Sequence, residues 1–334
     1  MAALASLYPT LVDITKRLDP NGSVSRVAEL LSKYNPIITD IAWHEGNLPT
    51  GHRFTARTAL PPVTWRKLNQ GVAPSKSSAD QYTETCGMLE GYSKIDAAVA
   101  AMNGNAAAFR ADEDNAFLMA MNIEVVNALF YYSTSVNPER LQGFSPRLAA
   151  TSGNVASAQI IKSDASASGA NQTSIWLVGW SPDTVFGIYP QGSIGGLQSE
   201  DLGKQLVPDA GGTNFFTAWV THYVWKLGLC VRDWRYLVRI CNIDVTRWKA
   251  DLSQGADLAM SMMDAIAALY SLQGIQPIFY MTRQAYSMLN KQLAKKATVN
   301  FLEYIERGGV RIPSFMGVPI RLTDGLTQTE SVVS

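Results

Sequence analysis

The stretch from Asp40 to Met88 constrains the fold most, because it has too few apolar residues to form a core of its own. It is rich in Thr and Arg, contains several glycines, and is interrupted by Pro49, Pro61, Pro62 and Pro74. Two runs within it, His52–Leu60 and Val63–Leu68, alternate in polarity and predict the strands of a long hairpin. An excursion of this length is unusual inside a compact domain. We therefore expect the segment to pack on a neighbouring molecule.

The overall composition points the same way. The chain has 334 residues, of which 47% are hydrophobic and only 17% charged, with 28 basic and 28 acidic side chains. About a quarter of residues are charged in an ordinary soluble domain. The low value indicates that much of the surface faces other protein. A net charge of zero argues against a dedicated nucleic-acid binder, because Lys and Arg supply such proteins with their affinity for phosphate.

The sequence shows no feature of export or membrane insertion. Residues 1–20 have no basic segment ahead of an apolar run, and no stretch approaches the length of apolar chain that spans a bilayer. Cys86, Cys230 and Cys241 are odd in number and widely spaced, so we expect buried free thiols in a reducing compartment. The expectation is a soluble, intracellular protein.

The best predicted helix is Asp112–Tyr132. Three acidic residues would occupy its first turn, where negative charge suits the helix dipole. Apolar side chains recur at helical spacing on more than one side, so we expect a rod of about 32 Å that is buried along much of its length.

The remaining elements are mixed. Helices are predicted at 7–20, 24–34, 256–272 and 284–295, and strands at 158–162, 173–180, 184–189, 278–281 and 318–322. The block from Phe215 to Asp244 predicts a long hairpin that turns near Asp233. Its second arm would place Tyr236, Val238 and Ile240 on one face. Arg235 and Arg239 would fall on the other face, which could be solvated or contact a neighbour.

No motif predicts catalysis, a cofactor or a metal. His44 and Glu45 lack the second histidine of a zinc helix, so we interpret them as a surface loop pair. The glycine-rich run 192–198 lacks the Lys and Ser/Thr of a phosphate-binding loop, and we interpret it as a flexible turn. Residues 179–183 fail the pattern of a nucleophile elbow.

The candidate functional residues are basic and aromatic, and they lie in the long excursion. Arg53, Arg57, Arg66 and Lys67 could contact nucleic acid or form salt bridges between subunits. Trp65 stands among them. Because Arg and aromatic residues are the usual anchors of protein interfaces, we favour contacts between subunits.

Several runs together resemble the major capsid proteins of tailed phages, especially those with short tails. They are EGNLPTGHR at 45–53, LPPVTWRKLN at 60–69, SIWLVGW at 174–180, GIYP at 187–190 and VRDWRY at 231–236. The resemblance covers most of the chain. It implies an α+β protein with the Hong Kong 97 capsid fold.

The resemblance also implies a division of the chain. The expected parts are an N-terminal arm at 1–40, an extended β loop at 41–90, a peripheral domain with a long spine helix at 91–134 and 214–245, and an apical domain at 135–213 and 246–334. In archetypal members the peripheral hairpin follows the helix–strand set of the apical domain. Here the hairpin-like block at 215–244 precedes that set, so we expect a rearranged strand order.

The function that the resemblance implies is self-assembly, as pentamers and hexamers, into an icosahedral shell that encloses double-stranded DNA without reading its sequence. Scaffolding, cement and portal proteins are further candidate partners, and assembly would take place in the bacterial cytoplasm. The alternatives are a nanocompartment shell or vertex protein of the same fold, and a soluble hydrolase. A compact monomer of 36.4 kDa exposes about 13,500 Å², and we expect the isolated subunit to exceed that value.

Overall fold

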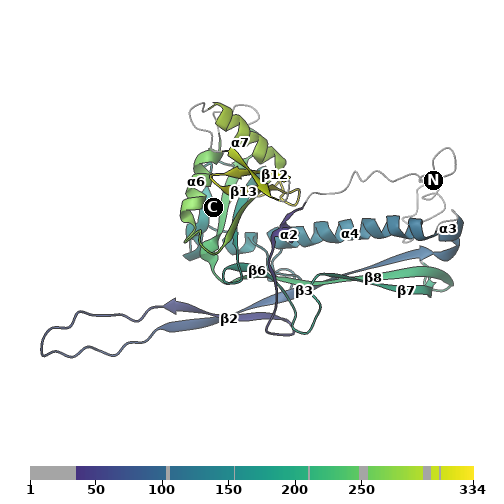
Figure 1. Cartoon of the computed structure of the whole chain (residues 1–334), viewed down its shortest axis with the longest axis horizontal. Helices are drawn as coiled ribbons and strands as arrows, with labels where there is room; N and C mark the ends of the chain where they lie inside the picture. The colour runs from purple at the N-terminus through teal and green to yellow at the C-terminus, as the bar shows by residue number, and fades with distance from the viewer. Residues whose placement is uncertain are drawn as a thin grey trace.

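The computed structural model of the chain describes residues 35–102, 106–153, 155–209, 211–247, 255–295, 302–307 and 310–334. The helices predicted at 7–20 and 24–34 therefore lie outside the described residues. Figure 1 shows a lobe of helices and strands, a long arm that extends to one side, and a hairpin that extends to the other.

The lobe is built on strands covered by helices. Its strands are β4 (Ile160–Lys162), β5 (Gln172–Trp180), β9 (Leu237–Asp244), β10 (Gln276–Met281), β11 (Leu302–Arg307), β12 (Val310–Phe315) and β13 (Val318–Leu322). Its α-helices are α6 (Leu258–Ala268) and α7 (Arg283–Lys295), and three short 3-10 turns are η1 (Ser145–Leu148), η2 (Val155–Gln159) and η3 (Trp234–Tyr236). A short helix, α2 (Ile37–Asp40), leads into the lobe.

The centre of the lobe is β5, which is buried at all nine positions. It pairs with β10 on one side and with β9 on the other, both antiparallel. A strand enclosed in this way reads as a continuous apolar run, as the sequence SIWLVGW does. Helix α7 buries Ala285, Met288, Leu289 and Leu293, which share one helical face.

The arm consists of three long strands, one short helix and one long helix. The strands are β3 (Ser78–Asp96), β7 (Leu197–Pro208) and β8 (Phe215–Val231), and the helices are α3 (Ala97–Met102) and α4 (Ala106–Tyr131). Strand β8 lies between β3 and β7 and pairs antiparallel with both. Its last residues pair with β6 (Val185–Tyr189) and so join the arm to the lobe. Helix α4 runs alongside the three strands (Figure 1).

The hairpin consists of β2 (Gly51–Ala59) and the first part of β3. Their register runs from Gly51 opposite Thr85 to Ala59 opposite Ser78. The first predicted strand, His52–Leu60, is thus confirmed. The second, Val63–Leu68, is wrong, because these residues form an irregular loop at the tip and the true partner strand begins at Ser78. Pro61 and Pro62 have no N–H to donate and end the ladder after β2.

The spine helix is longer than expected. Within the described residues it begins at Ala106, so the acidic residues at 112–114 do not form its first turn. The alanine-rich start, a strong helix former, extends the helix toward the N-terminus. Burial is also less even than expected: apart from Phe109, the buried residues fall between Met121 and Phe130.

The expected hairpin of Phe215–Asp244 is wrong. Strands β8 and β9 both form, but they pair with different partners: β8 with β3, β7 and β6, and β9 with β5 and β4. All eight residues of β9 are buried, Arg239 included, so its second face is neither solvated nor free for a neighbour. Local alternation predicted the strands but not which strands they join.

Other expectations are confirmed to within a few residues, namely β5, β6, β10, β13, α6 and α7. The strand expected at Ala158–Lys162 is shorter, since its first residues form η2. Strands β7, β11 and β12 were not predicted. His44 and Glu45 belong to β1 (Trp43–Glu45), which pairs parallel to β6, so their interpretation as a loop pair is wrong.

The rearranged strand order was expected because the β-rich block at 215–244 precedes the helix–strand set in the chain. The structure has the elements in this order. Strands β7 and β8 precede α6, β10, α7 and β13, and these later elements lie in the lobe (Figure 1). The rearrangement relative to archetypal members and the expected domain boundaries stay predictions.

A buried ion pair fastens the lobe to the spine helix. Arg239 of β9 donates to Glu330 (2.9 Å) and to the carbonyl oxygen of Leu148 (2.8 Å). Glu330 also accepts hydrogen bonds from Tyr131, at the end of α4 (2.7 Å), and from Ser174 of β5. The side chains of Arg239 and Glu330 are 4% and 7% exposed. Four segments far apart in the chain therefore meet at one carboxylate.

A second polar contact fixes the segment that enters the lobe. Asp40 accepts hydrogen bonds from Arg321 (3.0 Å) and Tyr280 (3.1 Å). Burial, and next the charge of Asp40, raise the pKa of Tyr280 well above its ordinary value. Ile37 of α2 is fully buried in the same core.

The isolated subunit has an accessible surface of 18691 Å². A compact protein of this mass exposes about 13,500 Å². The expectation of a large excess is confirmed.

Breaking the buried ion pair should destabilise the protein strongly. We expect Glu330→Ala to lower the free energy of unfolding by about 3–5 kcal/mol, because it leaves the Arg239 guanidinium buried without its counter-charge. Denaturant unfolding followed by circular dichroism measures the change.

The matched control is Arg232→Ala. Arg232 pairs with Asp183 at 2.9 Å on the surface, where the side chains are 46% and 85% exposed. Loss of that pair should cost less than about 1 kcal/mol. Equal losses for the two variants would contradict a special role for the buried pair.

Candidate assembly surface on the extended hairpin

The stem of the hairpin is held by side chains as well as by its ladder. The Asn47 amide donates to the carbonyl oxygen of Arg53 and accepts from its N–H, both at 2.7 Å. The Arg53 guanidinium donates to Thr83 on the opposite strand (3.2 Å). Phe54 and Tyr82 stack across the two strands with their ring centroids 5.7 Å apart. The stem is therefore an ordered rod.

A salt bridge fastens the stem to the body. Arg147, in η1, donates to both carboxylate oxygens of Glu84 on β3, at 2.6 and 2.7 Å. It also donates to the carbonyl oxygens of Gly143 and Gln142. Bidentate pairs of this kind fix direction as well as distance. The angle at which the hairpin leaves the body thus depends on Arg147.

Two histidines pack against one aromatic ring at the base of the hairpin. His44 of β1 and His52 of β2 both make T-shaped contacts with Phe186 of β6, at centroid distances of 5.5 and 5.7 Å. His52 Nδ1 is buried without a hydrogen-bond partner. Burial, and next the positive charge of Arg232, lower the pKa of His52 below its ordinary value of 6.5.

The tip of the hairpin, residues 60–77, exposes apolar side chains to solvent. Trp65 is completely exposed, and Leu68 and Val63 are 93% and 89% exposed. A local turn shapes this end: the Gln70 N–H donates to the Lys67 carbonyl oxygen at 3.2 Å, and Asn69 has a φ of 64°. Exposed apolar clusters of this kind mark interaction sites.

The part of the hairpin formed by β2 and the tip is also basic. Residues 46–79 contain no Asp or Glu but carry Arg53, Arg57, Arg66, Lys67 and Lys76. Within the described part of the chain, none of these five cations has an ion-pair partner. The tip therefore combines an aromatic side chain with unpaired positive charge.

The structure brings only some of the predicted site residues together. Trp65, Arg66 and Lys67 are adjacent at the tip, where the Arg66 guanidinium donates to the Gln70 carbonyl oxygen (2.9 Å). Arg53 and Arg57 lie on the stem, and Arg57 lines a cavity of about 610 Å³ between the hairpin and the lobe. Sequence reasoning missed Arg147 and Glu84, since nothing local to either residue indicates a partner 63 positions away.

The three cysteines are free, and Cys230 and Cys241 are buried as expected. Cys86 is only partly buried. Burial raises the pKa of Cys86 and of Cys230 to about 12. Among the described residues, no group of three or more His, Cys, Asp or Glu is placed to hold a metal ion. No helix in that part of the chain is long and apolar enough to cross a membrane.

Comparison with known proteins shows the family to which this chain belongs. The model of the family described as "Major capsid protein GP7" matches residues 19–334. The chain belongs to this family. Among curated proteins, none matches.

Solved structures agree with the family. A chain in the structure of bacteriophage Epsilon15 is 35% identical, with a TM-score of 0.81, and the match covers 100% of this chain and 99% of that one. A chain of the bacteriophage JBD30 capsid is 11% identical (TM-score 0.49, 89% and 93% covered). A chain of the SrpI encapsulin of Synechococcus elongatus is 10% identical (TM-score 0.43, 67% and 93% covered). We base no argument on the last two.

The major capsid protein therefore has the Hong Kong 97-like capsid fold, and it forms the icosahedral shell of the virion by self-association into capsomers. The family is one of structural proteins, which does not favour the hydrolase alternative. In this setting the apolar, basic hairpin tip is the strongest candidate for an assembly contact.

We expect Arg147→Lys to loosen the base of the hairpin, because a lysine ammonium cannot reproduce the two-pronged contact with Glu84. The protein should lose about 2–3 kcal/mol of stability. Amide hydrogen exchange of β2 and of the first half of β3 should become faster.

Arg283→Lys is the control for this substitution. Arg283 pairs with Asp324 at 3.2 Å, with side chains 60% and 31% exposed. The Arg283→Lys variant should leave amide hydrogen exchange in the hairpin unchanged. Unchanged exchange in Arg147→Lys would contradict the role of the Glu84 salt bridge.

The hairpin base should weaken in mild acid. Because the folded-state pKa of His52 lies below 6.5, the unfolded chain binds a proton first as the pH falls. Stability that is present at neutral pH is then lost progressively from about pH 6.5 down to the folded-state pKa. Replacing the histidine, as in His52→Gln, should make stability between pH 7 and pH 5 less dependent on pH. An unchanged pH slope in this variant would assign the acid sensitivity elsewhere.

Proposed function

We propose that the capsid protein builds its shell through the extended hairpin, whose tip contacts a neighbouring subunit in pentamers and hexamers. The observation that carries the proposal is the tip itself. Trp65, Leu68 and Val63 are exposed almost completely on an ordered stem, where they contact little of their own subunit. Holding such apolar surface in water is unfavourable, and burial against another subunit removes that cost.

The stem makes the contact effective. Because Glu84 and Arg147 fix the direction of the hairpin, little conformational entropy is lost when the tip docks. Each contact is small, but every subunit takes part in two of them, once through its own tip and once through the surface that binds a neighbour's tip. Closed symmetry limits such head-to-tail contacts to rings and shells.

We further propose that the shell encloses double-stranded DNA without sequence-specific binding. The net charge of zero supports this role, because many copies can pack closely without repelling one another and without attracting DNA strongly. Assembly in the bacterial cytoplasm suits a protein with three free cysteines.

Removing the tip tests the assembly role. Ala59 and Ser78 are register partners, so a two-residue Asn-Gly turn can replace residues 60–77 without disturbing the stem. We expect a folded subunit, with unchanged circular dichroism, that forms no shells in negative-stain microscopy or sedimentation.

Thr64→Ala is the matched control, because it removes a small polar side chain next to Trp65 and should leave assembly intact. Shells of normal yield and size from the deletion variant would overturn the proposal.

A further inference from the structure

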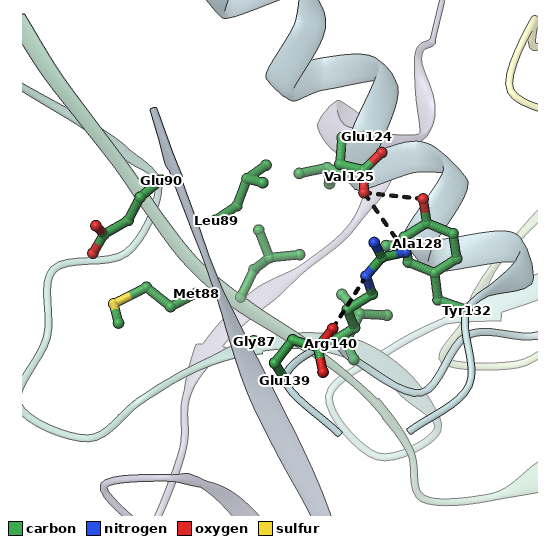
Figure 2. Close-up of a pocket in the computed structure, with 12 residues that line it drawn as sticks. Gly87, Met88, Leu89, Glu90, Glu124, Val125, Ala128, Tyr132, Glu139 and Arg140 are labelled. Atoms are coloured by element: carbon green, nitrogen blue, oxygen red, sulfur yellow. Dashed lines mark hydrogen bonds and ion pairs between the residues drawn. The ribbon is translucent and has the colours of Figure 1, made fainter. Parts of the chain in front are cut away.

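A cavity of about 310 Å³ lies between β3 and the C-terminal part of α4. No described residue of the same chain fills it. Figure 2 shows Leu89 of β3 facing Val125 and Ala128 of α4 across this space. Leu227 of β8 and the Tyr132 ring complete its apolar side. The cavity offers room and apolar surface for one large side chain.

The rim of the cavity is acidic. The charged side chains that face it are Glu124, Glu139 and a single cation, Arg140, so acidic groups are in excess by one. Arg140 lies over the Tyr132 ring (4.1 Å to the centroid) and is 3.9 Å from Glu124 and 3.8 Å from Glu139. One arginine thus faces two carboxylates, while Glu90 points to the other side of β3 (Figure 2).

The walls of the cavity are held in place before any partner arrives. The N–H groups of Gly143 and Phe144 donate to the carbonyl oxygens of Tyr132 and Leu129, both at 2.8 Å, and so complete the end of α4. A side chain at Gly87 would meet the Glu139 carbonyl oxygen at 3.1 Å. The loop that carries Glu139 and Arg140 therefore packs closely against β3 at Gly87, where a larger residue would require the loop to shift slightly.

The strand beside the cavity has an open edge. From Cys86 to Asp96, β3 pairs with β8 on one side, and on the other side β2 pairs with it only as far as Thr85. Among the described strands, none pairs with this second edge beyond that point. Long open edges are surfaces at which proteins add a partner.

The hairpin tip of the same subunit is not the occupant. Figure 1 shows the tip at the far end of the hairpin, pointing away from α4. The described residues of the same subunit therefore supply no occupant with this chemistry. The tip of a second copy has the complementary chemistry. It carries an exposed indole for the apolar side and cations without ion-pair partners for the acidic rim, and it contains no acidic residue.

We propose that this cavity receives the hairpin tip of a second copy of the protein, with Trp65 against the apolar side and Lys67 against Glu139. The proposal rests on the proposed function and identifies the receiving surface. Trp65 supplies the buried aromatic anchor that dominates many interfaces. Lys67 is the better partner for Glu139, because the Arg66 guanidinium is already engaged by the Gln70 carbonyl oxygen.

A charge exchange tests the pairing in the full-length protein. Both side chains are exposed in the subunit, so Lys67→Glu and Glu139→Lys should each fold normally. Each single variant places like charges together, and the yield of sedimenting shells should fall about tenfold or more. The double variant restores opposite charges and should recover shells to within about threefold of the original yield. Failure of the double variant to recover would overturn the pairing.

Cysteine cross-linking tests proximity independently of yield. Shells of the Lys67→Cys/Glu139→Cys variant, oxidised in place, should give a ladder of linked subunits on non-reducing gels. The two single-cysteine variants should give no ladder, which controls for the native Cys86 near the cavity. Intact shells of the double variant without a ladder would place the tip elsewhere.

These outcomes separate the inference from the function on which it rests. If the tip deletion abolishes shells while neither charge rescue nor cross-linking is seen, the tip acts at another surface and only this inference fails. If the tip deletion still forms shells, the assembly role of the hairpin itself is wrong. A Trp65→Ala variant with unchanged shell yield would remove the anchor from the proposal.

Discussion

The continuity of a single strand governs the shape of this capsid protein. Over its 19 residues, β3 pairs first with β2 and then, from Cys86 onward, with β8. No loop separates the two pairings, so the hairpin takes its direction from the arm. The Glu84 salt bridge and the acidic cavity both lie along this strand. A kink in β3 would therefore alter the reach of the tip and the receiving surface together.

Charge is distributed in a way that the neutral total conceals. Residues 46–79 are exclusively basic among the charged types, so acidic residues must be in excess elsewhere, and the rim beside α4 is one such place. In the interior, by contrast, Arg239 and Glu330 balance each other inside a closed set of hydrogen bonds. Charges at the surface can thus serve association while the buried pair serves the fold.

Sequence reasoning succeeded where the cause of a structure is local. Strand β5 and helix α7 were predicted, because an apolar run and helical spacing can each be read over a short window. It failed where the cause is a distant partner. Val63–Leu68 alternates like a strand but has no partner in register, and β8 was matched with β9 although its hydrogen bonds go to β3 and β7. The receiving cavity combines β3, β8, α4 and a loop, and no window contains all of them.

The long-range ties within the lobe bear on the order in which the chain folds. The bonds from Tyr131 to Glu330, Tyr280 to Asp40 and Arg321 to Asp40 join residues 199, 240 and 281 positions apart. Contacts so distant in sequence form slowly, whereas the β2–β3 ladder has to close only the much shorter loop at 60–77. The hairpin can thus be complete while the lobe is still open, and its apolar tip is then exposed to premature association. Folding of the lobe therefore competes with association of incompletely folded subunits through their tips. Lower protein concentrations or a chaperone would favour correctly folded subunits.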